Sequence, residues 1–491
     1  MQKLQQILKA PYYFLWLILF FVLHGYNEFV GYIRLSSLLL LIVEMSVVAW
    51  VLFFLFRKMY RDGHKAALLV TVLFFSYLFY SAIQDALAAH PPLFKWSLFP
   101  RLFPAFLLLC LFTVVALFRY KRSPVKMTRF LNVMFLTLML FDTCSIIWQL
   151  VTLKPPKDPV AAASIKPLAD TTNKPDVYLI LLDEYMGTAG LQKYYHYDNN
   201  AFESFLKQKG FHINTSSSSN YPYTVYSMAS LFNMRYLDPA EIGHSKDFDY
   251  KNLIGLIDHN AVAEYFKRFN YTIHNYSFFA FGGLEPNYHV MPWDIELITS
   301  RMLYAHSAAR IVYGVPQDYI DLSTIENWFK SKLATDLENQ IQGTLSSAGK
   351  QSPAFTYLHL LMPHKPFMFD STGKFANTYK AVKGHKQWGI DNLYLQYLVY
   401  TNKRLMKYLD QLFAATQGKA AIIVMSDHGN RDANAMRGMY FDYTNFNAVY
   451  LPNKDYHLWY DSVSNVNQFP LLFNTLFGQQ IPLKKDSTVH Y

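Results

Sequence analysis

The stretch Ala420-Ala-Ile-Ile-Val-Met-Ser-Asp427-His428-Gly429 joins a short apolar run to an adjacent carboxylate and imidazole. An uninterrupted apolar run of this length is typical of a parallel strand that is buried on both faces. In open α/β sheets, ligands bind just beyond the carboxyl ends of the strands. The stretch therefore predicts a buried strand that delivers Asp427 and His428 to the functional edge of a sheet.

A second stretch, Val177-Tyr-Leu-Ile-Leu-Leu-Asp183-Glu184, has the same form. Carboxylate oxygen and imidazole nitrogen are suitable ligands for a divalent cation. An isolated Asp-His pair could merely cap a strand end, but a second acidic strand end favours a metal site. We expect Asp183, Asp427 and His428 to be metal ligands. The role of Glu184 remains open: it could be a further metal ligand, a residue that supports the ligands or an acid that caps a helix.

Between these stretches lies a loop rich in hydroxyl groups, Asn220-Tyr-Pro-Tyr-Thr224-Val-Tyr-Ser227. A metal ion can lower the pKa of a hydroxyl and make it a nucleophile. A helix is expected to begin after Thr224, and its N-terminus would favour a bound phosphate. Thr224 is the candidate nucleophile, although a Thr before a helix is often only an N-cap. Ser227 and Ser230 are competing candidates.

A third element is Leu358-His359-Leu-Leu-Met-Pro-His364-Lys365-Pro366. His364, just after a strand-like run, could donate a hydrogen bond to a phosphoryl oxygen or a leaving group. Lys365 could add positive charge for substrate binding. A surface loop with a solvated His is the alternative. His359, inside the apolar run, is expected to be a core histidine.

Five apolar segments lie in the first 152 residues, and each approaches the roughly 20 residues that a helix needs to cross a bilayer. They are residues 11–31, 36–56, 66–88, 101–118 and 130–152. We therefore expect residues 1–152 to form an all-α membrane domain of five transmembrane helices.

Two carboxyls, Glu44 and Asp142, fall inside the second and fifth apolar segments. Such groups are costly in a bilayer and usually face protein or water. A hydrogen bond between helices is the favoured interpretation, and a path for a lipid head group is the alternative.

The positive charge of the chain is concentrated in this first region. Residues 1–152 carry 14 Lys and Arg against 5 Asp and Glu, out of a net charge of +10 for the whole chain. The amino terminus and the loops 57–65 and 119–129 carry 11 basic residues, and the alternate loops carry 3. Because basic loops stay in the cytoplasm, we expect the amino terminus inside and everything after the fifth span outside. No Lys/Arg run marks a nucleic-acid-binding surface, so no nucleic-acid partner is expected.

The rest of the chain reads as a linker and a second domain. Residues 153–175 are rich in Pro, Ala, Ser and Thr, as in an extended linker. In residues 176–491, apolar strand-like runs alternate with helical patterns, which predicts an α/β domain with a mainly parallel sheet. Strands are expected at 177–182, 354–361 and 420–425, and helices at 197–209, 260–268, 325–341 and 394–415.

The ordered set Asp183, Thr224, His364 and Asp427-His428 resembles the alkaline-phosphatase superfamily. Within it, the set is similar to the sulfatase-like branch that includes lipoteichoic acid synthases and lipid A phosphoethanolamine transferases, which also join five membrane helices to an extracytoplasmic catalytic domain. The resemblance implies an α/β/α sandwich for the catalytic domain. It implies that Asp183, Asp427 and His428 bind the metal, that Thr224 binds it and carries the transferred group, and that His364, in a His-x-Pro motif, contacts that group.

The chain also departs from this family. Formylglycine sulfatases carry Cys or Ser in a Cys/Ser-x-Pro-x-Arg motif, whereas the corresponding stretch here is Thr224-Val-Tyr-Ser-Met. This favours a phospho-threonine intermediate over sulfate-ester hydrolysis. After Gly429 the chain reads Asn430-Arg431-Asp432, where the family commonly has an acidic residue. No clear second set of ligands is present, so we expect one divalent ion, Zn, Mn or Mg.

The hypothesis is a multi-pass enzyme of the inner (cytoplasmic) membrane whose catalytic domain lies outside the cytoplasm. It would move a phospho-alcohol group, phosphoglycerol or phosphoethanolamine, from a phospholipid donor to a glycan, lipid or polymer acceptor. One alternative is a phosphodiesterase or sulfatase-like hydrolase that uses water as the acceptor. A non-catalytic surface protein on the same scaffold is the other.

Overall fold

The structure is a computed structural model that describes residues 2–28, 30, 33, 35–152, 174–242, 250–288, 303, 306–308, 323–350, 353–382, 386–431 and 443–489. The chain divides into two compact units. One contains Met1–Leu153, and the other contains most of the chain from Lys154 onward. Apart from residues 174 and 175, the expected linker lies outside the described residues.

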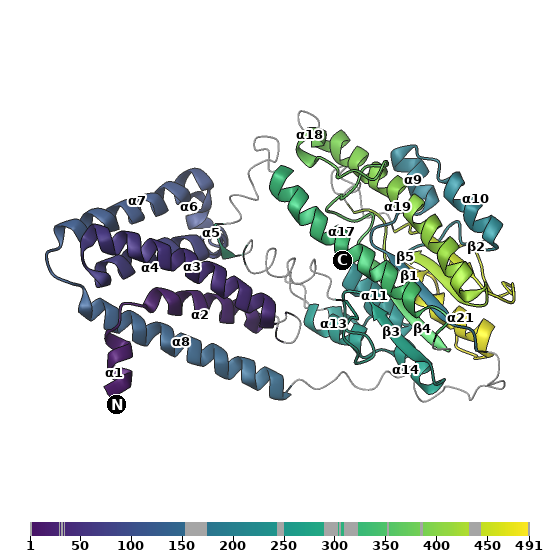
Figure 1. The fold of residues 1–491 in the computed structure, drawn as a ribbon, viewed down its shortest axis with the longest axis horizontal. Helices are drawn as coiled ribbons and strands as arrows, with labels where there is room; N and C mark the ends of the chain where they lie inside the picture. The colour runs from purple at the N-terminus through teal and green to yellow at the C-terminus, as the bar shows by residue number, and fades with distance from the viewer. Residues whose placement is uncertain are drawn as a thin grey trace. The chain divides into compact units, whose positions relative to one another are not determined.

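The first unit is helical (Figure 1). Its elements are α1 (Gln2–Lys9), α2 (Tyr13–Glu28), α3 (Leu35–Tyr60), α4 (Gly63–Leu78), α5 (Tyr80–Ala88), the 3-10 turn η1 (Pro91–Leu93), α6 (Phe94–Ser97), α7 (Phe99–Arg119) and α8 (Val125–Thr152). Each of the five expected spans therefore coincides with a helix or, for residues 66–88, with the pair α4 and α5.

Not every one of these helices is long enough to cross a bilayer alone. Among the described residues, Ser37–Tyr60, Arg101–Arg119 and Val125–Val151 are long and apolar enough. The pair α4 and α5 is bent by 52° and would add a fourth span, whereas the apolar part of α2, Tyr13–Asn27, is shorter. The unit thus has three or four candidate spans, and the exact number of five remains a prediction.

The buried Asp142 of α8 takes part in a hydrogen bond between helices. Its Oδ1 lies 3.2 Å from Nδ1 of His24 and accepts a longer bond of 3.5 Å from Nδ2 of Asn27, both on α2. Asn27 in turn accepts a hydrogen bond from Ser145. The structure thus agrees with the favoured interpretation of Asp142, which is a hydrogen bond between helices. The other carboxyl, Glu44 on α3, is exposed at the surface of the unit.

The second unit is built on a six-stranded sheet with the order β2-β6-β5-β1-β4-β3. The strands are β1 (Val177–Leu182), β2 (His212–Ile213), β3 (Thr272–Tyr276), β4 (Ala354–Leu360), β5 (Ala421–Ser426) and β6 (Asn447–Tyr450). Strands β5, β1, β4 and β3 pair in parallel, and β6 pairs antiparallel with both β5 and β2. The sheet is therefore mainly parallel, as expected, with an antiparallel strand near one edge.

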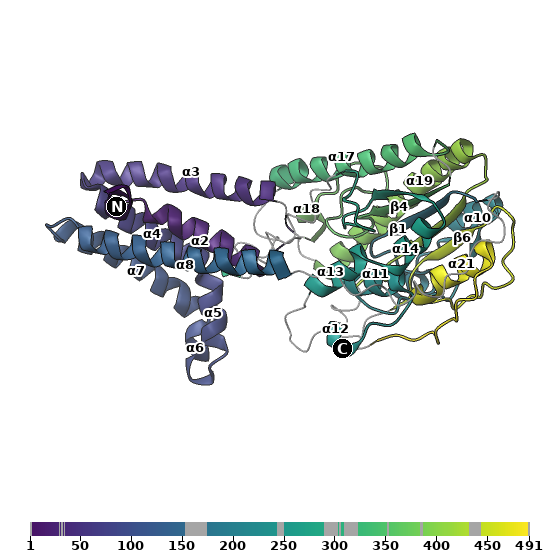
Figure 2. The same ribbon diagram turned by 90° about the horizontal axis from the view of Figure 1, so that it is seen from below.

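Helices cover both faces of this sheet (Figure 2). They are α9 (Thr188–Tyr195), α10 (Asn200–Lys209), α11 (Thr224–Asn233), α12 (Pro239–Ile242), α13 (Tyr250–Asp258), α14 (Ala261–Arg268), α17 (Ser323–Ser347), α18 (Thr378–Val382), α19 (Lys386–Thr416) and α21 (Gln468–Phe477), with a 3-10 turn η4 (Asn465–Asn467). The four expected helices correspond to α10, α14, α17 and α19.

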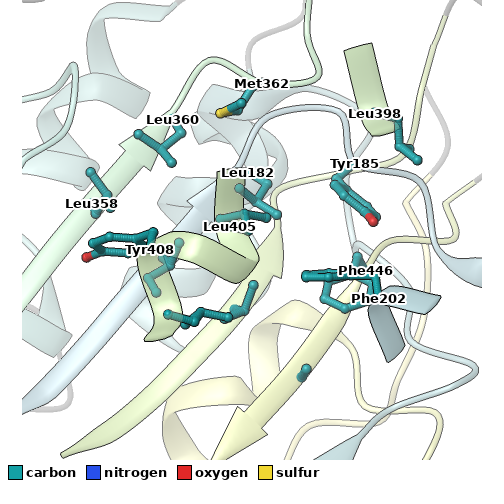
Figure 3. Packing of buried hydrophobic residues seen from close by; sticks show 14 of the residues in the cluster. Leu182, Tyr185, Phe202, Leu358, Leu360, Met362, Leu398, Leu405, Tyr408 and Phe446 are labelled. Carbon is teal, nitrogen blue, oxygen red and sulfur yellow. The ribbon is translucent and has the colours of Figure 1, made fainter. Parts of the chain in front are cut away.

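The strand residues alternate between these two helical layers because side chains along a strand point to opposite faces. Ile180, Leu182 and Leu358 belong to a core shared with α10, α17 and α19, part of which Figure 3 shows. On the other face, Phe355 stacks on Phe266 of α14 with ring centroids 4.1 Å apart. Burial on both faces explains why these strands are apolar throughout. The unit is an α/β/α sandwich.

Candidate functional site

The two acidic strand ends meet because β1 and β5 are neighbours in the sheet. Their register pairs Leu182 with Ser426, so Asp183 and Asp427 both follow directly after the last paired residues. Strand β4 flanks β1 on the other side and pairs Leu360 with Leu182. The carboxyl ends of three adjacent parallel strands thus bring together segments that are far apart in the sequence.

A cluster of potential metal ligands lies at this edge. Within the described part of the chain, one such group was found: Asp183, Asp427 and His428 each offer a ligand atom, all within 4.8 Å of one another. All three residues are buried. The structure therefore places together the three non-hydroxyl ligands expected from the sequence.

The Asp427 carboxylate is oriented by the backbone. Its Oδ1 accepts hydrogen bonds from the backbone N–H groups of Glu184 (3.1 Å) and His428 (2.8 Å). Its Oδ2 is buried and has no hydrogen-bond partner among the described residues. One oxygen of Asp427 is thus fixed, and the other remains to bind a cation.

The hydrogen bonds of His428 define which ring nitrogen can bind a metal. Nδ1 lies 2.8 Å from the carbonyl oxygen of Gly429, which can only accept, so Nδ1 carries the proton. Burial lowers the pKa of His428, which favours the neutral ring with a lone pair on Nε2. That lone pair lies 3.1 Å from Asp427 Oδ2. Two acceptor atoms at this separation repel each other unless a cation lies between them, so the donor set fits a divalent metal.

Asp183 carries the second unsatisfied carboxylate. Its Oδ1 is buried without a hydrogen-bond partner among the described residues. Burial, and then the nearby Asp427 carboxylate, raise the pKa of Asp183 well above its usual range. Two buried carboxylates this close are stable together only when a proton or a cation offsets their charge.

Thr224 lies against this cluster. It is the first residue of α11, and its Oγ1 is 3.2 Å from Nε2 of His428. Because that nitrogen is an acceptor, the Thr224 hydroxyl donates the hydrogen bond. Tyr223 is the N-cap of the helix, with no side-chain cap bond, so the Thr224 hydroxyl does not act as an N-cap. The helix begins one residue earlier than expected.

The hydroxyls of the two competing serines are engaged elsewhere. Ser227 is fully buried and donates a hydrogen bond of 2.6 Å to the carbonyl oxygen of Asp427, and Ser230 donates to the carbonyl oxygen of Arg235. The Asp427 carbonyl also accepts a 2.8 Å bond from the side-chain amide of Asn465. The contribution of Asn465 was not recognised in the sequence, where nothing marks it, because it arrives from a distant 3-10 turn.

Glu184 forms an ion pair at the rim of the cluster. Its Oε1 accepts a hydrogen bond of 2.7 Å from Nε of Arg431. Burial alone would raise the pKa of Glu184, but His364 and Arg431 outweigh it and lower the pKa to about 2. Arg431 is a second residue that the sequence pointed to only indirectly, as a departure from the usual residues after Gly429.

His364 and Lys365 follow β4, on the loop beside Glu184. The side chain of His364 is mostly buried, and its Nε2 lies 3.3 Å from Nη2 of Arg431 and 3.9 Å from Glu184 Oε1. The structure thus places His364 at the rim of the cluster rather than in a solvated surface loop. Lys365 is exposed, and its role in substrate binding remains a prediction.

His359 is a core histidine, as expected, but it lies close to the ligands. Burial lowers its pKa to about 3, and Nδ1 is 2.9 Å from the hydroxyl of Tyr357. Its Nε2 has no hydrogen-bond partner among the described residues and lies 3.8 Å from Asp183 Oδ2. The neutral ring therefore forms the inner wall beside Asp183.

The profile of the sulfatase family matches residues 175–467, which is more than half of the chain. No curated protein sequence matches this chain. Among solved structures, the chain is similar to the soluble domain of lipooligosaccharide phosphoethanolamine transferase A from Neisseria meningitidis (13% identity, covering 64% of this chain and 90% of that chain, TM-score 0.40). It is also similar to the periplasmic domain of EcEptC from Escherichia coli in complex with Zn (13% identity, covering 64% of this chain and 87% of that chain, TM-score 0.38). A third similar structure is the phosphonate monoester hydrolase of Agrobacterium radiobacter (14% identity, covering 62% of this chain and 74% of that chain, TM-score 0.40).

Proposed function

Because this chain belongs to the sulfatase family, we propose that it is a membrane-anchored, metal-dependent transferase that acts through a phospho-threonine intermediate. The transferred unit is a phospho-alcohol group, phosphoglycerol or phosphoethanolamine, taken from a phospholipid. The observation that carries the proposal is the Thr224 hydroxyl, which hydrogen-bonds to Nε2 of His428 at 3.2 Å within the cluster of potential ligands.

Asp183, Asp427, His428 and Thr224 would hold one divalent ion, Zn, Mn or Mg. The unsatisfied oxygens of the two carboxylates and the unprotonated Nε2 of His428 support this assignment. When bound, such an ion lowers the pKa of a neighbouring hydroxyl and offsets the negative charge of a phosphodiester. The donor set holds no thiolate, since the catalytic domain contains no cysteine.

In the first step, Thr224 Oγ1 loses its proton and forms a bond to phosphorus, while the bond from phosphorus to the lipid alcohol oxygen breaks and that oxygen takes up a proton. In the second step, the hydroxyl oxygen of the acceptor loses its proton and attacks the same phosphorus, and the bond from phosphorus to Thr224 Oγ1 breaks, so that Thr224 regains its hydroxyl proton. His364, at the rim of the cluster, exchanges the proton that the leaving alcohol gains and the entering alcohol loses. The acceptor is a glycan, lipid or polymer of the cell envelope.

The proposed setting is the inner (cytoplasmic) membrane, with five spans and the catalytic domain outside the cytoplasm. The apolar helices of the first unit and the unequal distribution of basic residues over its loops support this setting. A membrane anchor suits a lipid donor, because confinement in two dimensions raises the effective concentration of the lipid.

The test is mass spectrometry of the purified full-length protein after incubation with Mn²⁺ and vesicles of phosphatidylglycerol or phosphatidylethanolamine. We expect a phosphoglycerol or phosphoethanolamine adduct on the peptide that contains Thr224. Thr224→Ala should remove the adduct, and Thr224→Ser should retain part of it. Ser230→Ala, in the same helix, is the matched control and should keep the full adduct.

Two results would contradict the proposal. An adduct on Ser227 or Ser230 would remove Thr224 from its role. Steady release of a soluble phospho-alcohol in the presence of envelope acceptors, with no modified acceptor, would identify a hydrolase that uses water.

A further inference from the structure

Arg431 is a cation that lies beside the metal-ligand cluster and has no role in the two steps proposed above. Its side chain is only 28% exposed, and Nε donates a hydrogen bond of 2.7 Å to Glu184 Oε1. The guanidinium lies over the ring of Tyr223, 5.2 Å from the centroid. Tyr223 immediately precedes Thr224, and Glu184 immediately follows Asp183, so both contacts of Arg431 are with chain neighbours of site residues.

The contact between Arg431 and His364 defines the state of that histidine. A guanidinium can only donate, so Nε2 of His364 is the acceptor in the 3.3 Å contact with Nη2. Its Nδ1 faces the carbonyl oxygen of Lys365 and therefore carries the proton. Nε2 of His364 and Nη2 of Arg431 thus face each other at the rim of the cluster.

The ion pair with Glu184 fixes Arg431 without using up its donors. The described contacts involve Nε and Nη2, two of the three nitrogens that carry the five N–H groups of the guanidinium. The bond at 3.3 Å is longer than usual for a charged donor, so another acceptor can replace His364 at little cost. The guanidinium fork matches the oxygens of a phosphoryl group, and partial burial strengthens that interaction.

We propose that Arg431 binds a non-bridging oxygen of the phosphoryl group attached to Thr224, with Glu184 as its anchor. This inference rests on the proposed function. When Nη2 turns from His364 to the phosphoryl oxygen, Nε2 of His364 is released to accept the proton of the entering alcohol. In this proposal Glu184 is a positioning residue and not a metal ligand. Of the three roles that the sequence left open for Glu184, the proposal therefore selects the supporting one.

The experiment compares Arg431→Gln, Arg431→Lys and Glu184→Gln in the full-length protein, with Arg404→Gln as the control. Arg404 also pairs with a glutamate, Glu338, but lies on α19 outside the site. Three quantities are measured: the Kd of Mn²⁺, the Kd of inorganic phosphate for the Mn²⁺-loaded protein, and kcat/KM for a chromogenic phosphodiester. Thermal melting shows whether each variant is folded.

We expect Arg431→Gln to weaken phosphate binding about 10-fold to 100-fold, the range for a lost charge-assisted hydrogen bond, and to change the Kd of Mn²⁺ less than about threefold. Arg431→Lys should recover part of the phosphate affinity, because the charge returns without the fork. Glu184→Gln should weaken phosphate binding while Mn²⁺ still binds. Arg404→Gln should match the wild type.

The inference is overturned if Arg431→Gln binds phosphate as the wild type does, or if its phosphate and Mn²⁺ affinities fall together. Loss of Mn²⁺ binding in Glu184→Gln would make Glu184 a ligand and remove the anchor. A wild-type protein that binds sulfate in preference to phosphate would contradict the proposed function instead. The sulfate affinities of the same variants would then decide the role of Arg431.

Discussion

Asp183 and Asp427 are two carboxylates that the fold holds in one buried cluster, where two bare anions would repel each other. The backbone N–H groups of Glu184 and His428 satisfy one oxygen of Asp427. The other oxygen and Oδ1 of Asp183 have no hydrogen-bond partner in the described structure. A site of this kind is less stable without its metal, because the two charges repel each other in a region from which water is excluded.

The first prediction is that Asp183→Asn stabilises the metal-free protein and destabilises the metal-loaded one relative to the wild type. An acid with a raised pKa costs folding free energy above its unfolded pKa of about 3.9. Removing that charge should therefore raise the free energy of unfolding at pH 7 by about 1 to 3 kcal/mol in a chelator. With Mn²⁺ at 1,000 times the Kd, the wild type should gain about 4.1 kcal/mol, and the variant should gain almost none.

The pH dependence of this difference has a definite sign. In the chelator, the advantage of Asp183→Asn should be absent near pH 4 and should grow as the pH rises toward 7, because only the wild type must lose a proton from a buried group. Thermal melts of both proteins across this range measure it. Asp410→Asn, at an exposed ion pair with Lys209, is the control and should show no such trend. An Asp183→Asn variant that is less stable than the wild type at every pH would contradict the raised pKa.

At the scale of elements, the site depends on short segments that pack behind the ligands. The carbonyl oxygen of Asp427, just after β5, accepts hydrogen bonds from Ser227 of α11 and Asn465 of η4. The Asn465 amide also donates to the Ser227 hydroxyl at 3.0 Å. Three elements are thereby joined at one carbonyl group, which fixes the end of β5 relative to the helix that carries Thr224.

The second prediction concerns this junction. Asn465→Ala leaves the buried Asp427 carbonyl with one donor fewer, so the free energy of unfolding should fall by about 1 to 3 kcal/mol. The Kd of Mn²⁺ should rise as well, because the Asp427 backbone becomes less constrained. Chemical denaturation and Mn²⁺ titration measure the two effects. Asn453→Ala, in an exposed turn, should change neither. Unchanged Mn²⁺ affinity in a clearly destabilised Asn465→Ala protein would limit Asn465 to a role in folding.

At the scale of the whole molecule, the chain combines a helical unit with large exposed apolar side chains and an α/β/α unit whose apolar residues are mostly internal. Phe112, Phe141 and Trp148 of α7 and α8 are each at least 70% exposed. A surface of this kind is stable in lipid and would aggregate in water. The helical unit is therefore consistent with a membrane anchor, and the sandwich with a water-exposed catalytic domain.

The third prediction tests the topology of this anchor. A periplasmic reporter enzyme fused after residue 160 should be active, and a reporter that requires the cytoplasm should be inactive at the same position. Fusions within residues 119–129 should give the opposite pattern, because the five basic residues of this segment are expected to keep it in the cytoplasm. Cytoplasmic activity after residue 160 would contradict both the odd number of spans and access to a donor in the outer leaflet.

Features that depend on a local pattern of residues could be predicted from the amino-acid sequence alone. An apolar run that ends in Asp-His predicts a buried strand with ligands at its carboxyl end, and β5 has this form. The strand that ends at Asp183 and the positions of the apolar helices followed in the same way. Thr224 became a candidate because it lies in a hydroxyl-rich loop before an expected helix, which is a local signal.

Which of these features meet in space depends on tertiary packing. The register of β1 and β5 places Asp183 beside Asp427, and strand pairing depends on the packing of both helical layers rather than on either strand alone. Two contacts join residues that are far apart in the sequence: Thr224 with His428, 204 positions apart, and Glu184 with Arg431, 247 positions apart. The hydrogen bond from Asn465 to Asp427 spans 38 positions and begins in a turn without a periodic pattern. Contacts of this kind leave no local trace, because no residue in a short window is constrained by a partner that only folding brings near.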